Sequence, residues 1–193
     1  MIRFSALGVS EVRLPDGSPV PGLASKRLAL LAYLVLARPR GFHRRDTLLG
    51  LLWPESTQEK ARNALRQALH QLRAALGEGV VLTRGAAEVA VDAGALRCDA
   101  IAFEEELRAG RTAEALALYH GDLLPGLFVA DAPGFEDWLS RERGRLRELA
   151  AAAGWSLVAT TADPVARAAW VRWSIALSPL DELATRRGME ALR

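Results

Sequence analysis

Between residues 57 and 76 the apolar positions recur every three or four residues, which is the spacing of an amphipathic helix. On a helical wheel they form one stripe, made of Ala61, Ala64, Leu65, Ala68, Leu69, Leu72 and Leu76. Pro54 interrupts any helix before this segment, and Gly77 suits a left-handed C-terminal position. Ser56 and Glu59 have the spacing of a capping box, so the sequence predicts a capped helix over residues 57–76.

Two shorter apolar patterns precede this helix. Residues 25–37 carry a broad apolar face that ends before Pro39, and a second helix is predicted from Arg44 or Arg45 to Trp53. Only three residues separate that helix from the long one, a spacing typical of a helix-turn-helix.

β-prone runs flank the three predicted helices. Residues 80–84 and 88–91 surround Gly85 and predict a hairpin. Three helices followed by a hairpin indicate a winged helix. Short strand candidates at residues 2–8, 11–15 and 18–20 predict a small antiparallel sheet ahead of the helices, a variant found in response-regulator output domains.

The second half of the chain has a helical pattern. Helices are predicted at residues 99–110, 112–120, 135–161 and 164–177, and a last one is predicted to begin near Leu180. The helix pairs carry small Ala residues and resemble tetratricopeptide repeats. Residues 121–127 (GDLLPGL) interrupt the pattern. Glu104, Glu105 and Glu106 are expected to form a solvated face, and Asp122 is expected to cap a turn.

Charge divides the chain into the same two parts. Residues 1–95 hold 13 Lys and Arg against 8 Asp and Glu, whereas the remainder holds 12 against 15. A basic front half with an acidic rear half is typical of a DNA-binding domain joined to a protein-contact module. We therefore predict an α+β winged-helix domain at 1–95 and an all-α tetratricopeptide-like repeat domain at 96–193. Most of the basic side chains lie between residues 38 and 73, namely Arg38, Arg40, Arg44, Arg45, Lys60, Arg62, Arg66 and Arg73.

The polar face of the long helix has the chemistry of a DNA-reading surface. Arg pairs with guanine edges, Asn and Gln pair with adenine, and Arg or Lys binds phosphates. We expect Asn63, Arg66, Gln67 and His70 to contact base edges in the major groove. Phosphate contacts are expected from Lys60, Arg62, Arg73, Arg44 and Arg45. Arg84, at the hairpin tip, is expected to contact the DNA backbone or the minor groove. The alternative for this face is a basic surface that is solvated or covered by another domain.

Little in the sequence supports a disulfide, a catalytic site or a metal site. The single cysteine, Cys98, excludes an intrachain disulfide and is expected to be a small buried thiol. No Ser, His and Asp arrangement indicates a catalytic site, and we expect no enzyme activity, metal or cofactor. The start of the chain lacks a signal peptide, and its longest apolar run is too short to span a bilayer, so no membrane partner and a cytoplasmic location are expected.

Several segments resemble the Streptomyces-type antibiotic regulatory protein (SARP) family of transcriptional activators. In the first half they are residues 51–54 (LLWP), 61–65 (ARNAL) and 70–76 (HQLRAAL). In the second half, the bacterial transcriptional activator domain of that family is matched by Asp99, Phe103, residues 115–127 (ALALYHGDLLPGL), Trp138, Leu139, Arg141, Glu142, Arg143 and Leu146. The resemblance covers roughly residues 1–180.

This resemblance implies a sequence-specific regulator that binds double-stranded DNA and helps RNA polymerase engage a promoter. It leaves open whether a homodimer or two copies in tandem bind the DNA. The last predicted helix has no partner, which indicates that the repeat domain is truncated at its C-terminus, and no phosphate-binding loop occurs in the chain. The alternative function is a helical-repeat scaffold for protein partners whose winged helix does not bind DNA.

Overall fold

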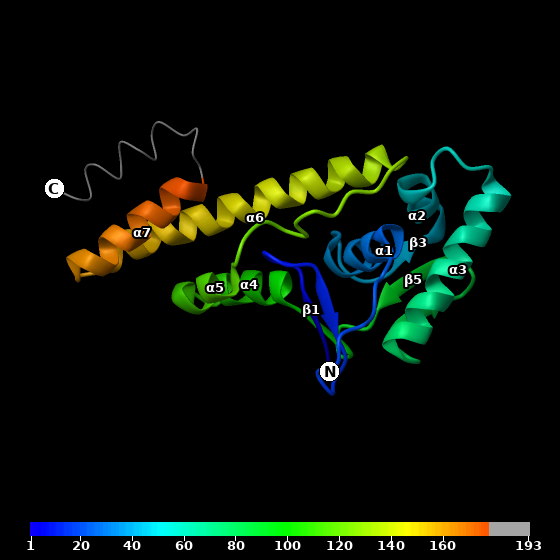
Figure 1. The fold of residues 1–193 in the computed structure, drawn as a ribbon, viewed down its shortest axis with the longest axis horizontal. Helices are drawn as coiled ribbons and strands as arrows, with labels where there is room; N and C mark the ends of the chain where they lie inside the picture. Colours follow the sequence, from blue (N-terminus) through cyan, green and yellow to red (C-terminus); the bar gives the residue numbers. More distant parts are fainter. Residues whose placement is uncertain (178–193) are drawn as a thin grey trace.

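The computed structural model describes residues 1–177 and shows a mixed α+β fold of small sheets and helices (Figure 1). The helix predicted from about Leu180 lies outside the described residues. The elements of the first half are β1 (Ile2–Ser5), β2 (Glu11–Arg13), α1 (Ser25–Leu36), β3 (His43–Arg44), α2 (Arg45–Leu52), α3 (Gln58–Leu76), β4 (Val81–Arg84), β5 (Glu88–Val91) and β6 (Leu96–Cys98). Those of the second half are α4 (Asp99–Arg108), α5 (Thr112–Leu118), α6 (Pro133–Thr160) and α7 (Pro164–Leu177).

The three predicted helices and the hairpin that follows them are confirmed as α1, α2, α3 and β4–β5. α1 is central to this group, because it packs on α2, on α3 and on β5. The hairpin forms a second sheet of order β3-β5-β4, in which both pairings are antiparallel. Strand β3 was not predicted, since its two residues are too few to show an alternating pattern.

The first sheet differs from the prediction in its third strand. Its order is β2-β1-β6, with β1 and β2 antiparallel and β1 and β6 parallel. Residues 18–20, predicted as a strand, form only an isolated bridge between Arg13 and Pro19. The position beside β1 is instead taken by residues 96–98, which lie far away in the sequence and were not predicted to be extended.

The second half is helical as predicted. α4 and α5 pack together as a pair, and α7 packs along α6. α6 has 28 residues and is therefore about 42 Å long. Figure 1 shows it running from α2 at one end to α7 at the other, so one helix contacts both halves of the chain.

At the predicted boundary between residues 95 and 96, the two halves of the chain are in direct contact. Strand β6 begins at this boundary and pairs with β1, and residues on both sides share one hydrophobic core. The carboxylate of Asp99 accepts hydrogen bonds from the backbone N–H groups of Ala6 (2.8 Å) and Leu7 (3.1 Å). At Gly8, an added Cβ would lie 2.6 Å from the carbonyl oxygen of His120, so only glycine permits this approach.

Across residues 1–177, no helix has both the length and the apolar character that a bilayer span requires.

Candidate nucleic-acid interface

Helix α3 is anchored by the apolar stripe that the sequence predicts. It packs against α1, α2 and β4. Its buried residues are Ala61, Leu65, Ala68, Leu69, Leu72 and Leu76. Ala64, the remaining member of the stripe, is half-buried. Because one side of α3 is fixed in the core, the opposite side faces solvent on a rigid support.

The predicted capping box does not form at the start of α3. Thr57 is the N-cap, so Ser56 lies one position before it and Glu59 is the second helical residue; the pair therefore lacks the N-cap and N3 positions that a capping box requires. No side-chain hydrogen bond caps this end. Glu59 still lies in the first turn, where a negative charge interacts favourably with the helix dipole.

The outward side of α3 is polar and free of acidic side chains after Glu59. Arg66 Nη2 donates a hydrogen bond of 2.5 Å to Asn63 Oδ1, and this bond leaves the amide NH2 of Asn63 available to a ligand. The exposed side chains of this surface are Lys60, Arg62, Asn63, Arg66, Gln67 and His70.

An open hollow of about 570 Å³ runs along this surface. It is lined by Asn63, Arg66, Gln67, His70 and Arg73. Arg73 is half-buried, and its Nε lies 3.4 Å from the carbonyl oxygen of Val81 in β4. The structure therefore brings the four predicted base-reading residues and one predicted phosphate contact together on one continuous surface.

Arg44 and Arg84 lie on the second sheet, on either side of one acidic residue. Glu88 in β5 is directly opposite both of them. Arg84 Nε donates a hydrogen bond of 2.5 Å to Glu88 Oε2, and this bond is the main cause of a lowered pKa of Glu88. The Arg84 guanidinium also lies 4.5 Å from the centroid of the Phe42 ring. The sequence analysis did not identify these two partners of Arg84. Glu88 lies opposite it in the register of the hairpin, and Phe42 directly precedes β3, which pairs with β5.

Arg45 joins α2 to the hairpin. Its backbone N–H donates a hydrogen bond of 2.8 Å to the carbonyl oxygen of Ala87, and its side chain is half-buried. Arg44, by contrast, is exposed and lies 3.5 Å from Asp46. Of these two neighbouring arginines, Arg44 has the more accessible guanidinium.

Two of the basic residues between positions 38 and 73 form ion pairs within the protein. Arg38 and Arg40 both bind the carboxylate of Glu104, and Arg145 binds it at 2.5 Å. Glu104 is only 5% exposed, so the prediction that it belongs to a solvated face is wrong. The α4–α5 pair turns Glu104 inward, toward α6 and the segment after α1, and the arginines there compensate its burial.

Two other polar predictions have clear outcomes. Asp122 was expected to cap a turn, but its carboxylate binds Arg147 of α6, with Nε 3.1 Å from Oδ1. Cys98 is buried as expected, and burial raises the pKa of its thiol to about 12. Within the described residues no group of three or more His, Cys, Asp or Glu side chains could hold a metal ion.

Comparison with known proteins finds a solved structure whose fold is similar to that of this chain. No family model and no curated protein matches the chain. Among solved structures, the chain is similar to Mycobacterium tuberculosis EmbR in complex with a low-affinity phosphopeptide, with a TM-score of 0.64 and 22% sequence identity. The likeness covers 98% of this chain and 54% of the EmbR chain, so this chain spans about half of the EmbR length. At this identity, the likeness concerns the fold alone.

Proposed function

We propose that the protein is a sequence-specific, DNA-binding transcriptional regulator that activates transcription by helping RNA polymerase engage a promoter. The observation that carries this proposal is the outward side of α3. There, side chains able to read bases and bind phosphates lie on a helix fixed by its apolar stripe, with no acidic residue among them.

In this proposal α1, α2, α3 and the β4–β5 hairpin act as a winged helix. α3 is the recognition helix and enters the major groove, whose width admits an α-helix. Asn63, Arg66, Gln67 and His70 contact base edges. Lys60, Arg62, Arg73, Arg44 and Arg45 contact phosphates.

Arg84 contacts the DNA backbone beside the hairpin in the same proposal. Its hydrogen bond with Glu88 holds the guanidinium near the hairpin tip, and a phosphate competes with that carboxylate. Glu88 is accordingly expected to lower the contribution of Arg84 compared with that of Lys60, which forms no ion pair with any residue in the described part of the chain.

The second half is proposed to act as a tetratricopeptide-like activator domain that contacts RNA polymerase. The sequence resemblance to the SARP family supports this role. α4 and α5 pack as one helix pair and α6 and α7 as another, an arrangement that suits such repeats.

In vitro selection from a random duplex library tests the proposal. We expect the full chain to enrich one short sequence and to bind it more tightly than a random duplex at the same salt concentration. Two enriched half-sites at a fixed spacing would indicate that two copies bind side by side. Recovery of unenriched DNA after repeated rounds would contradict sequence-specific binding.

A further inference from the structure

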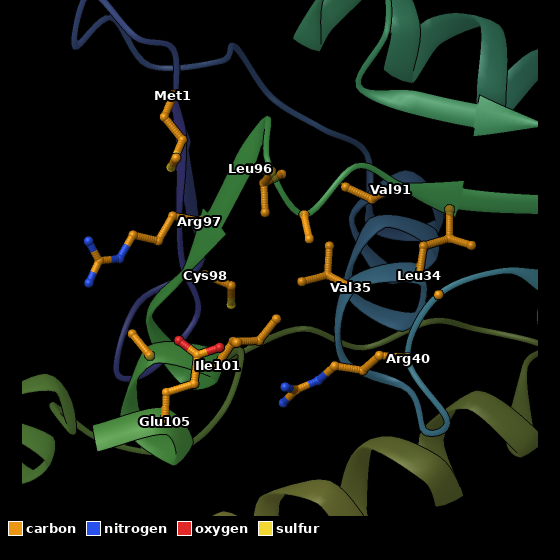
Figure 2. A pocket seen from close by; sticks show the side chains of 13 residues that line it. Met1, Leu34, Val35, Arg40, Val91, Leu96, Arg97, Cys98, Ile101 and Glu105 are labelled. Atoms are coloured by element: carbon orange, nitrogen blue, oxygen red, sulfur yellow. The ribbon is translucent and has the colours of Figure 1, made fainter. Parts of the chain in front are cut away.

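A second hollow, of about 310 Å³, lies where α1, the segment of residues 91–98 and α4 meet (Figure 2). This volume is at the lower end of the range for small-molecule sites. The hollow shares no lining residue with the outward side of α3. Most of its wall is apolar, formed by Leu34, Val35, Val91, Leu96, Cys98, Ile101 and Ala102.

Two side chains of opposite charge border the apolar wall. Figure 2 shows Arg40 and Glu105 reaching toward the same hollow from different sides, whereas Arg97 points away from it. No ion pair joins Arg40 to Glu105 in the described structure. Arg40 binds Glu104 through Nη2, but its Nε and Nη1 groups have no hydrogen-bond partner among the described residues, so they remain able to bind a ligand placed between Arg40 and Glu105.

The charges around Arg40 favour an additional anion. Arg40 belongs to the cluster in which Arg38, Arg40 and Arg145 surround Glu104, and Arg145 also binds Glu142 at 2.6 Å. Three guanidiniums in this cluster thus face two carboxylates. Glu104 also fixes the guanidinium of Arg40 in place, which reduces the entropy that a ligand must overcome.

Glu105 provides the opposite charge. It is exposed at the rim of the hollow, and the described residues contain no ion-pair partner for it. Its carboxylate is therefore available to an ammonium group at the mouth.

We propose that this hollow binds a small zwitterion with an apolar side chain, of the class of apolar α-amino acids. The ligand's carboxylate binds Arg40, its ammonium binds Glu105, and its side chain packs against Val35, Leu96 and Ile101. Binding is non-covalent, because the neighbouring thiol of Cys98 is almost fully buried and packs as part of the apolar wall.

Calorimetry on the full chain with chosen probes tests the ligand class. The probes are L-leucine and L-phenylalanine, and each is compared with analogues that lack one charge. For leucine these analogues are 4-methylpentanoate and 3-methylbutylamine, and for phenylalanine they are 3-phenylpropanoate and phenethylamine. We expect saturable binding of at least one amino acid, with both of its analogues about 10-fold weaker or worse. Absence of binding by both amino acids at millimolar concentrations would overturn the proposal, as would equal binding of an analogue.

Two variants locate the binding at this hollow. Ala93→Trp places a large side chain at the mouth, and Glu105→Gln removes the carboxylate; both positions are exposed, so folding is expected to persist. Ala117→Trp and Glu114→Gln, at exposed positions on α5, are the matched controls. We expect Ala93→Trp to abolish binding, Glu105→Gln to weaken it about 10-fold, and the controls to leave it unchanged. Undiminished binding by the Ala93→Trp variant, with an unchanged melting temperature, would overturn the assignment.

Discussion

Arg66 and Asn63 are joined by a hydrogen bond on the exposed side of α3, and this bond affects how the two side chains can take part in the proposed recognition of bases. It restrains the Arg66 guanidinium beside Asn63 and leaves further N–H groups that, in the proposed complex, pair with O6 and N7 of guanine. In the same proposed complex the Asn63 oxygen keeps its hydrogen bond while the NH2 group of Asn63 donates to a neighbouring base.

We expect Arg66→Ala to weaken binding to the selected duplex by roughly 1–3 kcal/mol and to relax specificity at one base pair. Fluorescence polarisation with the selected duplex, its single-base variants and a random duplex measures both effects. Arg108→Ala, at an exposed position on α4, is the control and should leave binding unchanged. Equal losses on selected and random duplexes would show that Arg66 does not read a base.

The surroundings of Glu104 determine its ionisation and its contribution to the stability of the fold. Burial opposes its ionisation, but the hydrogen bond from Arg145 and the charges of Arg145, Arg40 and Arg38 together lower the pKa of Glu104. A carboxyl group with a lowered pKa stabilises the folded state at pH values above its unfolded pKa, near 4.5. That contribution is lost as the pH falls through the folded pKa.

Glu104→Gln is expected to reduce the free energy of unfolding by about 2 kcal/mol at neutral pH, because three guanidiniums lose their common anion. The value is smaller than for a fully buried pair, since Arg38 is 48% exposed and the other two arginines about a third. Urea denaturation of both proteins measures this difference. The difference should shrink as the pH falls below about 4.5. A difference that stays constant down to lower pH would mean that the Glu104 charge is not the stabilising group.

At the scale of elements, α1, β3 and α6 meet through aromatic rings. The Tyr33 ring of α1 lies 5.3 Å from His43 of β3 and 5.0 Å from Trp138 of α6, measured between centroids. Nε2 of His43 is buried and has no hydrogen-bond partner among residues 1–177. Burial lowers the pKa of His43 below its usual 6.5, so the imidazole between these elements is neutral at neutral pH.

This contact predicts a pH dependence of stability. Between the usual pKa near 6.5 and the lower folded pKa, the unfolded chain binds a proton at His43 that the folded chain does not. The free energy of unfolding should therefore decrease as the pH falls from about 7.5 to about 5.5. His43→Phe, which keeps a ring beside Tyr33, should remove most of that decrease in urea denaturation. The same pH dependence in the variant would assign the effect to another group.

The elements that the sequence predicts well are those whose pattern is local. α3 follows from its apolar stripe, and the β4–β5 hairpin follows from two β-prone runs around Gly85. Strands β3 and β6 have two and three residues and exist because distant strands pair with them, so no local pattern indicates them. The role of Glu104 was missed for the same reason, since α6 and the segment after α1 provide its arginines.

The candidate site could also be predicted only where its residues follow from a local pattern. The outward residues of α3 follow from helical periodicity alone, and the structure exposes them together. The partial neutralisation of Arg84 depends on strand register, and the use of Arg38 and Arg40 by Glu104 depends on tertiary packing. A count of basic residues along the chain therefore overestimates the number of basic side chains that have no acidic partner.

At the scale of the whole molecule, the two halves are joined at several places. β6 pairs with β1, Asp99 binds the amides that follow β1, and the N–H of Leu124 donates a hydrogen bond of 2.7 Å to the carbonyl oxygen of Ala6. These contacts cross the boundary that charge and pattern suggested. The two halves are thus expected to fold as one cooperative unit.

A fragment of residues 1–95 tests this expectation. It lacks β6 and Asp99, so the edge of β1 and the amides of Ala6 and Leu7 lose their partners. We expect the fragment to melt at a much lower temperature than the full chain, or without a cooperative transition, in circular dichroism. A cooperative transition at the temperature of the full chain would instead establish an independent N-terminal domain.

If the outward side of α3 binds a DNA groove as proposed, duplex binding must depend on salt, because basic side chains that bind phosphates release counterions. Fluorescence polarisation of a random duplex, repeated from low to moderate salt, gives the slope of log K against log salt for the full chain. We expect binding at low salt that weakens steeply as salt increases, and a slope reduced by about 1 in Lys60→Ala but unchanged in Arg108→Ala. Absence of binding at low salt would show that α3 does not bind DNA and would favour a protein-binding scaffold. A slope that Lys60→Ala leaves unchanged would show that Lys60 does not bind a phosphate and would count against this side of α3 as the binding surface.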